Sequence, residues 1–441
     1  MSRILGIELR RSAAAGAVLM LLLAGVILLY VAPQRWSPGW MSVVMIQREY
    51  LVLLWPLALA VGAWQSRREH RSNVAELFAS TARPRAQRMM PTLGALAIAV
   101  TCAYLATVAA VVPWIIGTAR YLPATAFVIA AVGALAMIAA AWLGLAFGRL
   151  LPHVVTAPAL AVAGIGLLMV IPVAVRHREW LALIFSPMFG MGQYTDYQTV
   201  YGRVSAAQAI WLAALAGAGA VLLASGSWRT RVAALLPAIL GASLAIMVIP
   251  RDDKFVATPV DPVAQEQVCA EGSPQVCVSR VHSGLLPEAA PVARQALALL
   301  AKLPDPPTTV HEDTTTYYPA TSPPRQAEVV LMRITVDEHG HLADKAHILH
   351  EMVTTLGANT DGCRGTSSSV PVMRAAGYWL LGREPATDDP EEPPEVNAEA
   401  VKLWQGLRSL PEKEVAARVS TVRRAAMACE DLGGLLTGRA Q

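Results

Sequence analysis

Seven uncharged, apolar segments fill most of the first 250 residues of this chain, and each could form a helix that crosses a membrane. Such a helix needs about 20 apolar residues to span the hydrocarbon core of a bilayer. The segments cover residues 13–31, 50–64, 91–117, 123–147, 154–174, 206–226 and 232–249. We therefore predict an all-α polytopic membrane domain with about seven transmembrane helices, of which the second is the shortest.

The charge of the chain changes near residue 250. Residues 1–250 hold 18 arginines, no lysine and six acidic residues, whereas residues 251–441 hold 18 basic and 26 acidic residues. This asymmetry indicates two environments joined near residue 250. We expect a transmembrane domain over residues 1–250 and a separate domain over residues 251–441.

The arginines also predict the orientation in the membrane, because cytoplasmic segments are enriched in basic residues. With a cytoplasmic N-terminus, twelve arginines of the first half lie in the cytoplasm, and six lie on the opposite side. The six are Arg35, Arg48, Arg120, Arg176, Arg178 and Arg203. Seven crossings from a cytoplasmic N-terminus then place the C-terminal domain outside the cell.

The segment between the second and third apolar runs is unusually basic, with six arginines between Arg67 and Arg88. Within it, residues 73–80 are predicted to form a short amphipathic helix, because Val74, Leu77 and Phe78 share one face. Pro84 opposes continuation of that helix. A short amphipathic helix between two spans suits docking on a cytoplasmic partner, although a solvated loop that only sets topology has the same composition.

The order R-x-x-R-S-x-x-x-E-L-x-A-S-T-x-R-P-R-x-x-R, from Arg68 to Arg88, resembles the coupling-helix loop of permease subunits of actinobacterial ABC-2-type transporters. The resemblance covers roughly residues 1–226, with the loop at about 65–90, and the seventh span departs from it. It implies a permease that works as a homodimer, or as a heterodimer with a similar permease, and docks on a separate ATP-binding cassette ATPase. The residues expected to contact that ATPase are Arg67, Arg68, Arg71, Glu76, Leu77 and Phe78.

The C-terminal domain is predicted to be mostly helical. Helical patterns cover residues 289–303, 343–356, 370–381, 396–410 and 411–432, and residues 328–336 favour a strand. A proline-rich stretch, residues 304–324, separates the first helix from that strand.

Cysteine usage agrees with an extracellular location for this domain. Cys102 lies alone in the third apolar run, whereas Cys269, Cys277, Cys363 and Cys429 lie in the C-terminal domain. An even number of cysteines in an oxidising compartment favours two disulfides. We favour Cys269–Cys277 with Cys363–Cys429, since the first pair is close in sequence; four free thiols or a metal site are the alternatives.

One group of residues in the C-terminal domain could carry chemistry. His350 and Glu351 open the string His-Glu-Met-Val-Thr-Thr-Leu, and His347 precedes them by one helical turn. A zinc-peptidase helix needs His-Glu-x-x-His, in which two imidazoles bind the metal and the glutamate activates water. Thr354 stands at the second histidine position, so we expect no active zinc site; an inactive remnant and surface histidines are the alternatives.

No cofactor site is evident in the sequence. It contains no G-x-x-x-x-G-K-[ST] string, so energy for transport would come from a partner. Its basic residues lie at membrane boundaries, which does not indicate nucleic-acid binding. We therefore predict a membrane-spanning exporter subunit, surrounded by membrane lipid and without enzyme activity of its own. The alternatives are a membrane-anchored extracellular peptidase or pseudopeptidase and a sensor whose outer domain binds a ligand, and the exported substrate stays open.

Overall fold

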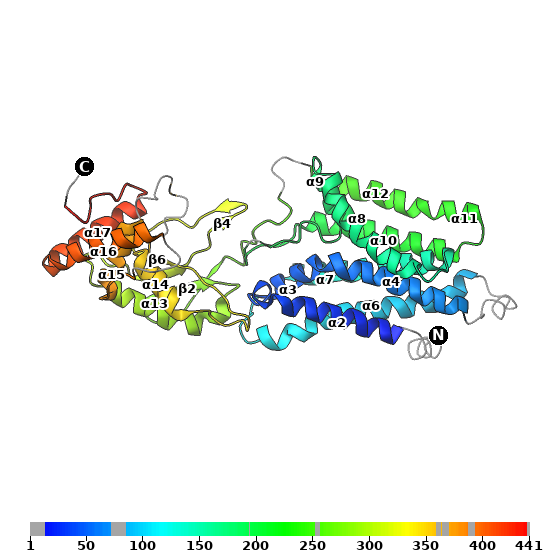
Figure 1. Cartoon of the computed structure of the whole chain (residues 1–441), viewed down its shortest axis with the longest axis horizontal. Coiled ribbons are helices and arrows are strands. Elements are labelled where there is room, and N and C mark those ends of the chain that lie inside the picture. Colours follow the sequence, from blue (N-terminus) through cyan, green and yellow to red (C-terminus); the bar gives the residue numbers. More distant parts are fainter. Residues whose placement is uncertain are drawn as a thin grey trace. The chain divides into compact units, whose positions relative to one another are not determined.

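The chain is organised as two compact units in a computed structural model (Figure 1). The described residues are 14–71, 85–193, 195–251, 256–358, 363, 370–386 and 393–438. The first unit comprises Met1–Gly117 and Leu122–Asp261, and the second comprises Thr118–Tyr121 and Pro262–Gln441. The second unit thus begins slightly later than the boundary that the sequence suggests at residue 250.

The first unit is a bundle of helices (Figure 1). Every one of the seven apolar segments overlaps a helix of this bundle, since its residues can satisfy their backbone polar groups internally. The helices are α2 (Ala14–Val31), α3 (Trp40–Glu49), α4 (Leu51–Arg71), α6 (Arg85–Ile115), α7 (Ala124–Leu150), α8 (Thr156–Ala174), α9 (Glu179–Phe185), α10 (Gly202–Ala224), α11 (Trp228–Ala233) and α12 (Leu235–Val248), with a 3-10 turn η1 (Pro33–Arg35) after α2.

Length and composition identify the first unit as membrane-spanning. Within the described residues, five helices are long and apolar enough to cross a bilayer. A sixth crossing results if α3 and α4, which meet at a bend of 56°, count as one span, and α2 is a shorter apolar helix. The structure thus supports a polytopic membrane protein, while the count of seven stays a prediction.

Helices α4 and α7 pack closely because glycines remove side chains from their contact. A Cβ atom at Gly144 would overlap the backbone of Leu59, and one at Gly148 would lie 2.6 Å from the Cα atom of Ala63. Gly62 of α4 lies equally close to the α7 backbone at Ala141. Small residues four apart let membrane helices approach in this way, which compensates for the weak hydrophobic force inside lipid.

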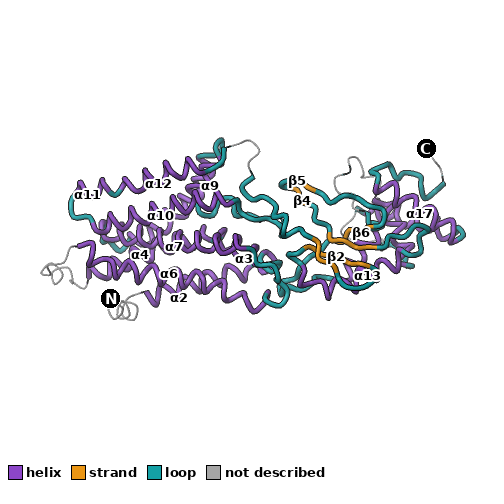
Figure 2. The backbone as a smooth tube through the Cα atoms, turned by 180° about the vertical axis from the view of Figure 1, so that it is seen from behind, coloured by secondary structure: helices purple, strands orange, loops and turns teal. Residues whose placement is uncertain are grey.

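The second unit contains helices and, among its described residues, a four-stranded sheet and a two-stranded hairpin (Figure 2). The sheet order is β1-β2-β3-β6, with β1 antiparallel to β2 and the other neighbours parallel. The strands are β1 (Gln267–Cys269), β2 (Gln275–Ser279), β3 (Thr309–Glu312) and β6 (Val329–Met332), and the hairpin is β4 (Thr316–Tyr317) with β5 (Ala320–Thr321). The helical elements are η2 (Ser283–Leu285), α13 (Leu286–Leu300), α14 (Lys345–Thr354), α15 (Val370–Leu381), α16 (Pro394–Arg408) and α17 (Glu412–Met427).

The expected helices of this unit are present, whereas most of its strands were not predicted from the sequence. The strand expected at residues 328–336 is the shorter β6, and the proline-rich stretch holds β3, β4 and β5. These strands are two to five residues long, so an alternating pattern cannot develop in them. Strand β3 also carries His311 and Glu312, which are not typical strand residues.

A single apolar core joins the sheet to the helices in the second unit. It includes Val276 and Val278 from β2, Val310 from β3 and Val330 from β6, all fully buried. Helix α13 packs on β2 and β3, and α14 packs on β6 and α13. Parallel strands covered by helices are buried, which agrees with the fully buried valines in these three strands.

Candidate functional site

The predicted docking segment lies between the ends of two long helices. Helix α4 continues to Arg71, so that Arg67, Arg68 and Arg71 occupy its last two turns, and α6 begins at Arg85. The other residues expected to contact an ATPase, Glu76, Leu77 and Phe78, lie outside the described residues.

Several helix ends that carry arginines meet at the same end of the bundle. Arg149 near the end of α7 donates from Nη1 to the carbonyl of Leu223, near the end of α10, at 2.7 Å. Trp142 of α7 donates to the carbonyl of Leu93, in the N-terminal third of α6, at 3.1 Å. The contact of Gly148 with Ala63 places the later part of α4 beside the later part of α7. We call this end of the first unit the arginine end.

The opposite end of the bundle carries tyrosine and tryptophan side chains. Tyr30 near the end of α2 donates to the carbonyl of Ala110 in α6 at 3.1 Å, and Trp114 donates from Nε1 to the Tyr30 hydroxyl at 2.5 Å. Trp36 packs edge-on against Tyr30. Because Trp and Tyr favour membrane interfaces, this aromatic group is typical of a bilayer boundary.

Among the described residues of the first unit, Arg48 is the most buried charged side chain. The sequence suggested a position in the connection between two spans, but the structure places Arg48 on α3 with a relative exposure of 1%. Its Nε and Nη2 atoms donate to the carbonyl of Pro187, at 3.2 and 2.7 Å. Nη1 donates to the carbonyl of Ile129 in α7 at 3.2 Å, and Nη2 also donates to Oε1 of Gln208 in α10 at 2.8 Å. One guanidinium therefore joins four segments of the bundle.

The residues around Arg48 are arranged to hold its side chain. Gln208 donates from Nε2 to the carbonyl of Leu183 in α9 at 2.9 Å, which fixes the orientation of its amide. A Cβ atom at position 133 would lie 2.8 Å from Cδ of Arg48, so Gly133 makes room for the arginine. The neighbouring Gln47 donates to the carbonyl of Tyr104 in α6 at 2.6 Å. The corner between α3 and α4 is thus tied to α6, α7, α9 and α10.

Among the described residues, no group of three or more His, Cys, Asp or Glu side chains is placed so that it could hold a metal ion. Glu351 lies 3.4 Å from the Arg333 guanidinium. His350 faces Arg383 through Nδ1 at 3.1 Å and packs edge-on against Tyr378. The backbone N–H of His347 donates to the side chain of Asp344, which caps α14. Of the zinc ligands considered from the sequence, His350 and Glu351 thus contact protein side chains, and the backbone of His347 takes part in the helix cap.

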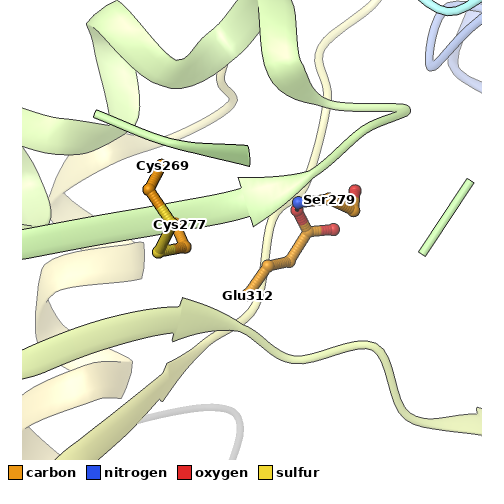
Figure 3. Close-up of a disulfide and its surroundings, with 4 residues drawn as sticks. All are labelled: Cys269, Cys277, Ser279 and Glu312. Carbon is orange, nitrogen blue, oxygen red and sulfur yellow. Dashed lines mark hydrogen bonds between the residues drawn. A yellow bond between two sulfur atoms is a disulfide. The ribbon is translucent and has the colours of Figure 1, made fainter. Parts of the chain in front are cut away.

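The structure contains both favoured disulfides within its described residues. Cys269–Cys277 links the paired strands β1 and β2 (Figure 3), and Cys363–Cys429 joins residues 66 apart, the second of them just beyond α17. Cys102, in α6, is the free cysteine in the described chain.

A buried acid–base pair lies close to the first disulfide and was not expected from the sequence. His282 Nδ1 is 2.6 Å from Oε1 of Glu312, and both side chains are 1% exposed. The second carboxylate oxygen of Glu312 accepts the backbone N–H of Ser279 at 2.7 Å (Figure 3). Ser279 Oγ also faces Nδ1 of His282, at 3.3 Å. In a serine-hydrolase triad the serine and the acid contact opposite ring nitrogens, so this geometry indicates a structural role.

No protein-family model, curated protein or solved structure matches this chain. Inferences about function therefore depend on its own residues. Arg48 could have been found as an ionisable residue in an apolar stretch, since such residues inside membrane domains mark functional positions. His282 and Glu312 gave no signal, because they are 30 residues apart and only the fold brings them together.

Proposed function

We propose that this chain is the membrane-spanning subunit of an ATP-driven exporter, and that a separate ATPase docks on the segment between α4 and α6. The observation that carries the proposal is the arginine end of the bundle. Arginines at the ends of α4 and α7, at the start of α6 and in α11 after α10 all belong to that end by connectivity and contact. A positively charged end is expected to face the cytoplasm, where ATP is available.

The helices on either side of the docking segment support this role. Only residues 72–84 connect α4 to α6, and each flanking helix is packed into the bundle through α7 or α2. A partner that binds this connection would therefore push on helices that are packed into the bundle. The resemblance of Arg68–Arg88 to the coupling-helix loop of ABC-2-type permeases leads to the same expectation.

In this proposal, Arg67, Arg68 and Arg71 steer the ATPase surface onto the amphipathic helix expected at residues 73–80, and Glu76 fixes the register of docking. Charge pairs around an apolar contact give specificity more than affinity. A permease of this kind acts as a dimer, so two copies of the segment would engage two ATPase subunits. The proposed location is the cell membrane, with the N-terminus in the cytoplasm and the second unit outside.

The test is ATP hydrolysis by the complex purified from its native membrane in mild detergent. Wild-type chain is expected to co-purify with an ATPase subunit and with vanadate-sensitive ATP hydrolysis. Glu76→Arg is expected to remove this activity while membrane insertion stays normal. The matched control is Glu412→Arg, which reverses an exposed charge at the start of α17.

Normal ATP hydrolysis and co-purification in Glu76→Arg, or wild-type complexes without ATPase activity, would contradict the proposal. Equal loss in the Glu412→Arg control would show that charge reversal harms folding in general. In that case the assay is repeated with Glu76→Gln, which removes the charge but keeps the size of the side chain.

A further inference from the structure

The segment from Leu183 to Met191, which we call the strap, includes the end of α9 and is held by apolar packing of its side chains and by hydrogen bonds to its backbone. Arg48 donates two hydrogen bonds to the carbonyl of Pro187, and Gln208 donates one to the carbonyl of Leu183. Ser186 and Met191 of the strap are fully buried. In addition to this packing, two side chains hold the strap backbone, one from α3 and one from α10, and they also bond to each other.

An arginine is a costly choice for a purely structural clamp. Within the described residues its guanidinium meets two backbone carbonyls and one amide oxygen, and no carboxylate balances its charge. Burial of an ion without an ionic partner carries a desolvation penalty, and apolar residues of similar volume often stabilise a fold as well or better. The penalty disappears when water reaches the guanidinium. The closed arrangement is therefore one that can be released.

The strap is also connected to the segment that follows α12 and leads to the second unit, which we call the linker. Arg251, after α12, lies over the ring of Trp180 in α9 at 5.0 Å. Farther along, the linker pairs with the segment before α10: the N–H of Thr199 donates to the carbonyl of Pro259 at 2.9 Å, and the N–H of Asp261 donates to the carbonyl of Tyr197 at 2.8 Å. A pull on the linker would act on both ends of the α9–α10 connection.

We infer that the strap is a movable closure at the end of the bundle opposite the arginine end, and that Arg48 is its latch. When the strap carbonyls of Pro187 and Leu183 are released, the Arg48 guanidinium becomes exposed to water. The linker to the second unit biases this step. The inference extends the proposed function, because it assigns the step that opens the outer end of the transport path. The inference can be wrong while the proposed function is right, because its test does not use ATP or a partner.

The test measures the accessibility of a buried strap cysteine in the full-length chain in nanodiscs. The reporter is Ser186→Cys in a Cys102→Ala background, and the measured quantity is its alkylation rate with N-ethylmaleimide. Arg48→Met is expected to raise this rate by about tenfold or more, the effect of losing hydrogen bonds to a charged group. Gln208→Leu, which keeps Arg48 but removes the bridge to Leu183, is expected to raise it less.

Two controls separate a latch from a general loss of stability. Ala140→Cys places the same reporter in α7, where Ala140 is fully buried, and its rate should not change with Arg48→Met. Arg35→Met breaks the exposed ion pair with Glu49, and neither reporter should respond. An unchanged Ser186→Cys rate in both Arg48→Met and Gln208→Leu would overturn the inference. Equal acceleration at both reporters would also overturn it, because Arg48 would then stabilise the whole bundle.

Discussion

Arg48 in the first unit and Glu312 in the second are buried charged groups with different surroundings. In the first unit, Arg48 is surrounded by backbone carbonyls and an amide, whereas in the second unit the buried Glu312 carboxylate faces His282. An ion held by neutral dipoles can exchange them for water with little loss. An acid–base pair that loses one partner leaves the other charge buried and unpaired. The comparison suggests that the site around Arg48 can rearrange, whereas the site around Glu312 is built to stay folded.

The two units also differ in what stabilises them. The contact between α4 and α7 depends on close backbone approach at glycines, and the second unit adds two disulfides to a mixed sheet and its helices. Disulfides restrict the unfolded chain and persist in oxidising compartments. They favour a rigid second unit without limiting motion in the first.

The largest expected effect is at the buried pair of the second unit. Glu312→Leu should destabilise this unit by about 3–5 kcal/mol, because His282 loses the buried carboxylate beside it and the N–H of Ser279 loses its acceptor. Glu266→Leu, which removes an exposed ion pair with Arg280, should cost at most about 1 kcal/mol. Urea unfolding of the two variants measures the difference. Equal effects would show that the buried pair stabilises this unit no more than an exposed ion pair does.

The disulfides should contribute unequally. In the chain-entropy model, loss of Cys363–Cys429, which closes 66 residues, costs about 4 kcal/mol, and loss of Cys269–Cys277, which closes eight, costs about 2.5 kcal/mol. Paired serine substitutions and denaturant unfolding under non-reducing conditions would measure both. Four alkylatable thiols in this unit of native protein would contradict the disulfides themselves.

The glycine contact of the first unit gives the third prediction. Gly148→Leu should force α4 away from α7 and destabilise the bundle by about 3 kcal/mol. Gly166→Leu in α8 is the matched control, because a Cβ atom there meets nothing within 4 Å. Thermal stability in detergent, read by size-exclusion chromatography, should fall for the first variant alone. A similar fall in both variants would mean that the stability of the bundle does not depend on close packing at this contact.

The smallest effect is the pH dependence of the second unit. Partial burial raises the pKa of Glu288, but hydrogen bonds and positive charge from His341 and Lys345 outweigh it, so the net pKa is below 4.5. Its contribution is therefore present above the unfolded value and is lost as pH falls through the folded value. Burial lowers the pKa of His311 below 6.5, so protonation favours the unfolded state as pH falls below 6.5.

Stability should therefore decrease in two stages on acidification. His311→Gln should flatten the first stage, which begins below pH 6.5, and Glu288→Gln should flatten the second, below pH 4.5. Urea midpoints measured across this range would show both. A wild-type midpoint that rises on acidification would contradict the assigned directions.

Local patterns in the sequence predicted secondary-structure elements better than they predicted contacts between elements. Residues 154–174 and 370–381 were expected to be helical, and the structure has helices at Thr156–Ala174 and Val370–Leu381. Apolar runs and helical periodicity are local, so one sequence suffices to see them. The bond between Arg48 and Gln208 joins residues 160 apart, and no local pattern encodes it. The short strands were missed because β2 and β3 depend on pairing with each other.

The account as a whole depends on the sidedness of the two units, and thiol labelling in intact cells tests it most directly. In a Cys102→Ala background, Ala320→Cys places a thiol on the exposed hairpin strand β5, and Ala75→Cys places one in the predicted docking segment. A membrane-impermeant maleimide should label Ala320→Cys in intact cells and Ala75→Cys only after permeabilisation. Labelling of Ala75→Cys in intact cells, or protection of Ala320→Cys until the cells are permeabilised, would contradict the predicted orientation and the proposed docking of an ATPase.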